Sequence, residues 1–171
     1  YPLRRQRQMC IRDRTGEKQM IKRKGDTVYT LGIDSGSTST NAVILDENRQ
    51  IKAFSVVRTG AKSSQSADAA LADVLKKAGL DREDISLIVS TGYGRVSIPF
   101  ADKNVTEISC HGKGAHLLFP DVHTILDIGG QDSKAIRLND NGEVADFVMN
   151  DKCAAGTGRF LEMMARSLEI S

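Results

Sequence analysis

Residues 30–57, TLGIDSGSTSTNAVILDENRQIKAFSVV, decide the fold of this chain. A short apolar run over residues 28–34 ends in Asp34 and leads into a cluster of Gly, Ser and Thr, which is the pattern of a buried strand that enters a tight turn. The same criteria predict strands over 41–45 and 51–58, separated by the DENRQ turn. The stretch is therefore expected to form a three-stranded meander.

The layout of this stretch recurs later in the chain. Residues 124–150, TILDIGGQDSKAIRLNDNGEVADFVMN, again give a strand that ends in Asp-x-Gly, a polar turn, a second strand, an Asn/Asp turn and a third strand. Asp34 and Asp127 occupy matching places, 93 residues apart. Such a duplication predicts two related halves that face each other. Only about the first fifty residues of the second half are present, so we expect a fragment whose second half exposes apolar surface.

Helices are predicted between and after the two repeats. An amphipathic helix over 66–78 is stopped by Gly79, and a strand over 85–90 and a helix over 108–119 follow. A last helix, over 153–168, has its apolar residues on one stripe. The fold class is therefore α/β and duplicated, with the second half truncated.

The composition limits the class of protein. The chain has 171 residues, 40% of them hydrophobic and 27% charged, which is enough apolar material for a core and excludes an intrinsically disordered protein. No apolar run approaches the roughly 20 residues that a membrane-spanning helix needs. The three cysteines, Cys10, Cys110 and Cys153, are too widely spaced for a disulfide framework. We therefore expect a protein of the reducing cytoplasm.

The first 26 residues differ in charge from the rest. Residues 1–26 carry nine Lys or Arg and three acidic residues, although the net charge of the whole chain is only +2. Basic arms of this kind are typical of contact with nucleic acid or membranes. This one has no apolar periodicity, and YPLRRQRQMCIRDR resembles translated sequencing-adaptor sequence, so we expect a non-native leader and neither of those partners. Residues 27–120 would then form the first half-domain, and residues 121–171 the start of the second.

The turns after the two strand-end aspartates have the composition of phosphate-binding loops. Their backbone N–H groups and hydroxyls converge, and glycine allows close approach of a ligand. Asp34 and Asp127 are candidates to hold Mg²⁺ through water. The candidate phosphate-binding residues are Gly36, Ser37, Thr38, Ser39, Thr40 and Asn41 in the first turn, and Gly129, Gly130, Gln131 and Asp132 in the second.

The number of turns decides between a structural and a functional interpretation. A lone turn of this kind is more often an ordinary hairpin, whereas a matching pair favours phosphate and metal binding. The sequence has no G-x-x-x-x-G-K-[ST] motif and no complete G-x-G-x-x-G motif. P-loop and Rossmann sites are thereby excluded.

The segment 150–160, NDKCAAGTGRF, holds a further candidate site. Asp151 suits a helix N-cap, which would place Cys153 in the first helical turn, where the helix dipole and Lys152 favour a thiolate. Thiolates bind iron and zinc, but a single cysteine is more often structural and cannot hold a metal unaided. Cys110, in an apolar helical stretch, is expected to be buried or half-buried without such a role.

Five segments between Tyr29 and the end of the chain carry a family resemblance: LGIDSGSTSTNAVILD, STGYGR, TEISCHGKGA, TILDIGGQDSKAI and MNDKCAAGTGRFLEMMA. With these segments the chain resembles the ATP-dependent activators of 2-hydroxyacyl-CoA dehydratases, the BadF/BadG/BcrA/BcrD-type ATPases, which are related to the ATPase subunits of benzoyl-CoA reductase. The string DKCAAGTGRF is its most specific part. The resemblance implies the ribonuclease H-like fold of the actin, hexokinase and heat-shock-chaperone ATPases.

The resemblance also implies an activity. It indicates a homodimer of anaerobic metabolism with one [4Fe-4S] cluster on its two-fold axis and Cys153 as one ligand, the second ligand lying in a Ser-Ser-Thr-Cys context beyond Ser171. ATP hydrolysis would drive one low-potential electron from ferredoxin or flavodoxin into a 2-hydroxyacyl-CoA dehydratase or a benzoyl-CoA reductase-like partner. Asp34 and Asp127 would be catalytic, and Gln131 is our candidate for positioning the attacking water.

Two other classes of protein stay open. A small-molecule kinase of the same fold would use Asp34 and Asp127 but would not need Cys153. A non-catalytic nucleotide sensor would bind ATP without turnover. A phosphorylated product formed by a Cys153→Ser variant would favour the kinase.

Overall fold

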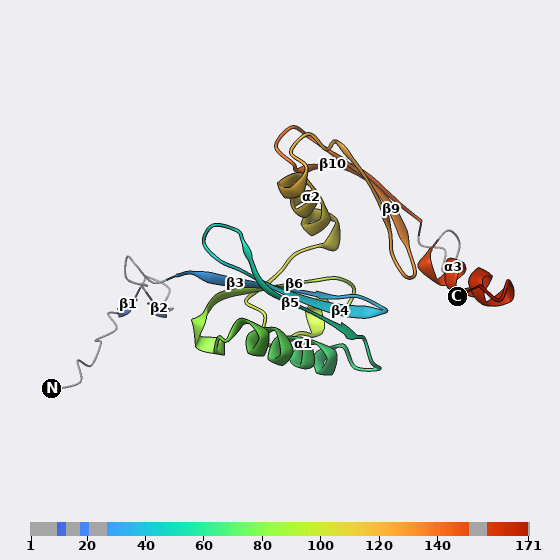
Figure 1. The fold of residues 1–171 in the computed structure, drawn as a ribbon. Coiled ribbons are helices and arrows are strands. Elements are labelled where there is room, and N and C mark those ends of the chain that lie inside the picture. Colours follow the sequence, from blue (N-terminus) through green and yellow to red (C-terminus); the bar gives the residue numbers. More distant parts are fainter. Residues whose placement is uncertain (1–9, 13–17, 21–26, 151–156, 171) are drawn as a thin grey trace.

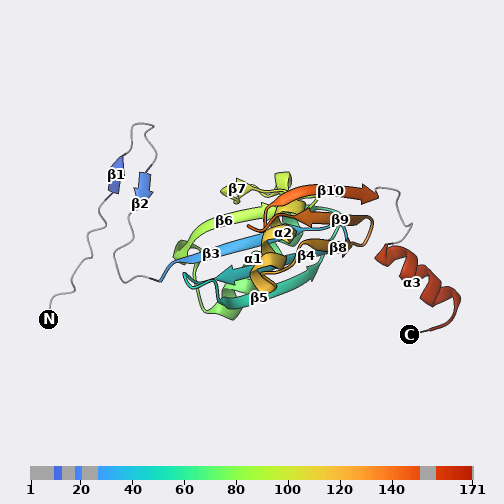
Figure 2. The same cartoon turned by 90° about the horizontal axis from the view of Figure 1, so that it is seen from above.

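The computed structural model describes residues 10–12, 18–20, 27–150 and 157–170. These residues form a short N-terminal hairpin and two sheets with their helices (Figure 1; Figure 2). The elements are β1 (Cys10–Arg12), β2 (Lys18–Met20), β3 (Tyr29–Ser35), β4 (Ser39–Leu45), β5 (Ile51–Arg58), α1 (Ser63–Ala78), η1 (Arg82–Asp84), β6 (Ile85–Thr91), η2 (Arg95–Ser97), β7 (Lys103–Asn104), α2 (Glu107–Leu118), β8 (Thr124–Ile128), β9 (Ser133–Leu138), β10 (Val144–Asn150) and α3 (Gly158–Ser167).

The first sheet has the strand order β5-β4-β3-β6-β7. Strands β3, β4 and β5 form the expected antiparallel meander, and β6 joins β3 in parallel. Helix α1 covers one face of this sheet (Figure 1), because alternate strand residues such as Leu31, Ile33, Ile44 and Ile88 point to that face and meet Val74 of the helix. These five side chains are at most 1% exposed, so the core of the first half lies between α1 and the sheet.

The second sheet has the order β10-β9-β8, with both pairings antiparallel. Helix α2 packs against β9 and β10, and its approach is close at Gly112, where an added Cβ would lie 3.1 Å from Leu138 Cδ2. Thr106 is the N-cap of α2, and its Oγ1 accepts a hydrogen bond from the backbone N–H of Ser109 at 3.3 Å. Helix α2 therefore covers one face of the second sheet.

Element bounds agree with the predicted pattern within a turn, with one correction. Gly79 ends α1 in the left-handed conformation, at φ 67°, and β5 has the predicted bounds. Helix α1 begins at Ser63, three residues before the predicted start, because its first turn is polar and lacks the apolar period that marked the rest. Helix α3 begins at Gly158, with Thr157 in extended conformation at the N-cap position and without a side-chain capping hydrogen bond, whereas the predicted helix began at residue 153; Asp151, the predicted cap, lies outside the described residues.

Apolar side chains are exposed on the second half, as expected. Leu126 and Ile128 of β8 are 76% and 63% exposed, and Val148 of β10 is 71% exposed. The predicted apolar stripe of α3 is also open to solvent; its residues are Phe160, Leu161, Met164 and Leu168. Among the described residues, no helix has both the length and the apolar character needed to cross a bilayer.

Candidate functional site

The two hairpins have the same register at their turns. Asp34 pairs with Asn41 across β3 and β4, and Asp127 pairs with Lys134 across β8 and β9. Because strand residues alternate between faces, Asp34 points away from α1, on the opposite face from the buried Ile33. Each hairpin thus presents its strand-end carboxylate beside the turn that follows it.

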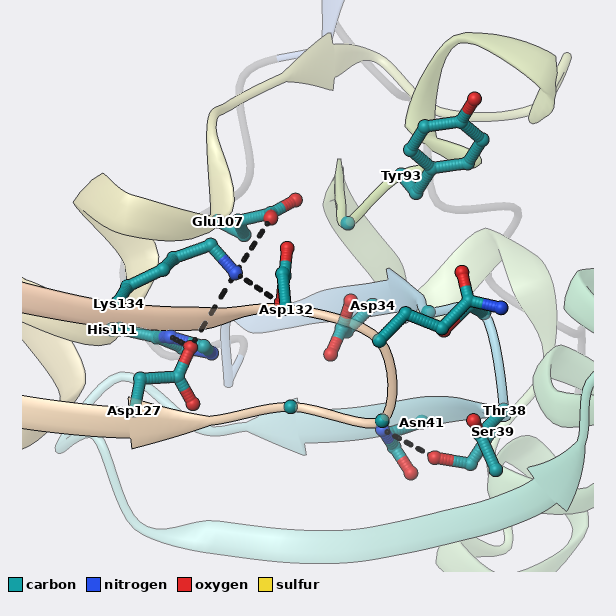
Figure 3. A pocket seen from close by; sticks show the side chains of 16 residues that line it. Asp34, Thr38, Ser39, Asn41, Tyr93, Glu107, His111, Asp127, Asp132 and Lys134 are labelled. Carbon is teal, nitrogen blue, oxygen red and sulfur yellow. Dashed lines mark hydrogen bonds and ion pairs between the residues drawn. The ribbon is translucent and has the colours of Figure 1, made fainter. Parts of the chain in front are cut away.

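The two turns lie against each other across a shared pocket. An added Cβ at Gly130 would lie 3.5 Å from Thr38 Cβ and 3.7 Å from Ser37 Oγ. The turn after β8 therefore contacts the turn after β3. The pocket is lined by Asp34, Gly36, Ser37, Thr38, Ser39, Asn41, Gly92, Tyr93, Glu107, His111, Asp127, Gly129, Gly130, Gln131, Asp132 and Lys134. Figure 3 shows the labelled members of this set, with residues of both hairpins around one space.

Most of the predicted site residues meet in this pocket, but Thr40 does not. Its side chain is fully buried on the α1 side of β4, where its Oγ1 lies 2.9 Å from Oγ1 of Thr59. The alternation of the strand accounts for this, since Ser39 and Asn41 face the pocket and the residue between them faces the opposite way. Cys153 lies outside the described residues, and Cys110 is a half-buried free cysteine of α2, as expected.

Three ionisable side chains of the pocket were missed by sequence reasoning. Glu107 and His111 come from the first turns of α2, one helical turn apart, and Lys134 comes from β9. The motifs TEISCHGKGA and TILDIGGQDSKAI contain all three, but nothing in their local pattern assigns them to the pocket. Two more pocket residues were not predicted from the sequence: Gly92 and Tyr93, in the turn after β6.

Lys134 lies at the centre of a carboxylate cluster. Its Nζ is 2.8 Å from Oδ1 of Asp132, 3.2 Å from Oε1 of Glu107 and 3.7 Å from Oδ2 of Asp127 (Figure 3). Its side chain is only 4% exposed. Burial by itself lowers the pKa of Lys134, but hydrogen bonds to Asp132 and Glu107 outweigh burial, and the pKa is raised above its ordinary value. Lys134 is therefore held as a cation.

Asp34 lies in a less favourable electrostatic setting. Burial raises the pKa of Asp34 above its usual range; His111 and a hydrogen bond from Asn41 lower it, and the charges of Glu107 and Asp127 raise it further. His111 Nδ1 lies 3.0 Å from Oδ2 of Asp127, a distance that suits an ion pair, although the two atoms are not aligned as a hydrogen bond. The pocket thus concentrates negative charge that a bound cation would neutralise.

The donor set fits Mg²⁺ bound through water and a second ligand. Asp34, Asp127, Asp132 and Glu107 supply hard carboxylate oxygens, which Mg²⁺ prefers. Within the described parts of the chain, no three acidic, His or Cys side chains converge closely enough to chelate a metal by themselves. A metal held here would therefore need further oxygen ligands, such as water and the oxygens of a bound phosphate.

The second turn is also bonded to the start of α3. The backbone N–H groups of Gly158 and Arg159 donate to the carbonyl oxygens of Gly129 and Gly130, at 2.9 and 3.2 Å. Thr157, the N-cap, is fully buried beside them. Both views place α3 beyond the end of β10 (Figure 1; Figure 2). These two hydrogen bonds tie a pocket-lining turn to the last helix.

Two facing hairpins with strand-end aspartates are the arrangement expected of the actin- and hexokinase-like fold. The BadF/BadG/BcrA/BcrD ATPase family matches residues 31–171, and the chain belongs to that family. It is 57% identical, over 144 residues, to the activator of lactoyl-CoA dehydratase of Anaerotignum propionicum, and the match covers 84% of this chain and 55% of the relative. The chain thus spans about half the length of the curated relatives it matches.

Solved structures agree with this assignment. Component A of (R)-2-hydroxyglutaryl-CoA dehydratase of Acidaminococcus fermentans superimposes with a TM-score of 0.79 at 48% identity, covering 84% of this chain and 55% of that one. The activator of 2-hydroxyisocaproyl-CoA dehydratase of Clostridium difficile, solved with bound ADPNP, gives 0.78 at 45% identity, covering 84% and 53%. A ROK hexokinase of Thermus thermophilus, at 12% identity and a TM-score of 0.51, shares the fold alone.

Proposed function

We propose that this chain is the nucleotide-binding part of an ATP-hydrolysing activator that delivers a low-potential electron to a 2-hydroxyacyl-CoA dehydratase or a related reductase. The observation that carries the proposal is the pocket in which two hairpins of matching register present Asp34 and Asp127 beside glycine-containing turns. The similar proteins named as dehydratase activators support the class of partner. Ferredoxin or flavodoxin is the proposed donor, and the cytoplasm the proposed location.

Each part of the pocket has a proposed role in ATP hydrolysis. Asp34 and Asp127 would hold Mg²⁺ through water, and the ion would supply positive charge beside the phosphates. The two turns bind the phosphate oxygens with their backbone N–H groups, which glycine allows to approach closely. Gln131, exposed at the pocket, positions the attacking water. Residues 27–120 and 121–171 are proposed to belong to separate half-domains.

The proposed electron carrier is a [4Fe-4S] cluster shared across a homodimer. Cys153 is its proposed ligand in this chain, on the basis of the DKCAAGTGRF resemblance. The hydrogen bonds from Gly158 and Arg159 to the second turn offer a physical route for coupling, since a turn that moves on binding phosphate pulls the start of α3 with it. The segment that carries Cys153 directly precedes this helix.

The test is an Asp127→Ala variant of the protein expressed from its complete reading frame. ATP-dependent electron delivery to the dehydratase is expected to fall at least about a hundredfold, because Asp127 would no longer help to hold the metal, while the visible absorption of the cluster is retained. Asp146→Ala is the matched control, since Asp146 is exposed on β10 outside the pocket. Loss of the cluster with retained ATPase activity would contradict the proposal.

A further inference from the structure

The second hairpin carries a cationic side chain, Lys134, that has no counterpart in the first hairpin. Asp34 has the neutral Asn41 opposite it, whereas Asp127 has Lys134 at the matching register position. The second hairpin also has a second carboxylate, Asp132, in its turn, and α2 adds Glu107. Lys134 therefore lies among three carboxylates, those of Asp127, Asp132 and Glu107.

The ammonium group of Lys134 occupies oxygens that a metal would use. Nζ lies within 3.7 Å of one oxygen each of Asp132, Glu107 and Asp127, and the side chain is 4% exposed, so its charge is directed at these groups and hardly at solvent. A divalent cation bound directly to the same oxygens would lie beside a fixed positive charge in a partly buried site, where screening is weak. The geometry thus opposes direct metal binding by the cluster alone.

We propose that Lys134 is a built-in counter-ion that keeps this carboxylate cluster from binding a divalent cation until a nucleotide supplies its own phosphate oxygens. The inference rests on the proposed function in that the metal concerned is the one used with ATP. Phosphates change the balance, because they bring negative charge and further hard ligands to the same space. Lys134 thereby makes the metal enter together with the nucleotide.

Mn²⁺ binding to the whole chain without nucleotide tests the proposal, with free Mn²⁺ followed by electron paramagnetic resonance. Lys134→Met and Lys134→Gln, which remove the charge, are expected to bind Mn²⁺ at least about tenfold more tightly than the wild-type chain. Lys134→Arg keeps the charge and is expected to bind as weakly as the wild type. Lys113→Met is the matched control, because Lys113 of α2 is exposed and donates to the carbonyl oxygen of Asn141 outside the pocket.

Two results overturn the proposal. One is unchanged Mn²⁺ binding in both neutral variants, each shown by circular dichroism to be folded. The other is an equal gain in Lys134→Arg, which would assign the effect to packing and not to charge. Since no nucleotide is present, the titration is independent of ATP hydrolysis; absence of ATPase activity in the wild-type protein would contradict the proposed function and leave the Mn²⁺ comparison intact.

Discussion

Replacing Gly92 by alanine is expected to damage both the stability of the first half and the position of Asp34. Gly92 has a φ of +84°, and an added Cβ would lie 2.7 Å from the carbonyl oxygen of Ser35 and closer still to Oδ1 of Asp34. Alanine in the left-handed conformation costs about 1 kcal/mol, and relieving these contacts costs about 2 kcal/mol more. The free energy of unfolding should therefore fall by about 3 kcal/mol, or the melting temperature by about 6–12 °C.

Gly79→Ala separates backbone strain from contact in this experiment. Gly79 has a φ of +67°, but no atom lies within 4 Å of an added Cβ. Its substitution should cost only the strain, about 1 kcal/mol, and should leave nucleotide affinity unchanged. Thermal unfolding by circular dichroism and titration with an ATP analogue measure the two effects. Equal losses of stability in the two variants would refute the reasoning, because the contacts at Gly92 would then carry no cost.

Two further predictions concern the second sheet and the helix that packs on it. Thr106→Ala removes the hydrogen bond that caps α2 and should lower the free energy of unfolding by about 1 kcal/mol, whereas Thr106→Ser should restore it; urea denaturation measures both. The pKa of His123 is raised by hydrogen bonds to the carbonyl oxygen of Asp121 and to Asp140, so the protonated ring favours the folded state. This stabilisation is fully present below the ordinary pKa of histidine and is lost as the pH rises through the raised value. The melting temperature of His123→Gln should accordingly fall below that of the wild type at pH 5.5 and match it at pH 8.5; the same small difference at both pH values would contradict the assignment.

Local pattern was sufficient to predict most of the strands and the two glycine-containing turns that follow Asp34 and Asp127. A strand whose apolar residues alternate, followed by Asp, Gly and hydroxyl residues, has few other conformations available, so Asp34, Asp127 and their turns could be identified before any contact was known. The same alternation could have excluded Thr40, because its neighbours Ser39 and Asn41 face the pocket. Thr40 was wrongly predicted as a pocket residue because all residues of the turn and of the following strand were assigned to the same face.

The cap of α3 was mispredicted for a local reason. Asp151 is a good N-cap by composition, but so is Thr157, and two glycines between Cys153 and Phe160 weaken a helix that would run through them. The structure places the cap at Thr157, where the backbone N–H groups of the next two residues bond to the second turn. The start of α3 at Gly158 thus coincides with a tertiary contact, which local sequence pattern does not predict.

The two matching hairpins, each with a carboxylate at the end of a strand, could be predicted from local sequence, because both features depend on residues that are neighbours along the chain. The charges that surround those carboxylates depend on tertiary packing. Glu107 and His111 reach the pocket because α2 packs on β9 and β10 through the close approach at Gly112. Lys134 then meets Glu107 from a strand that lies 27 residues further along the chain. Such contacts depend on how helices and sheets pack, and the periodicity of a single segment does not encode them.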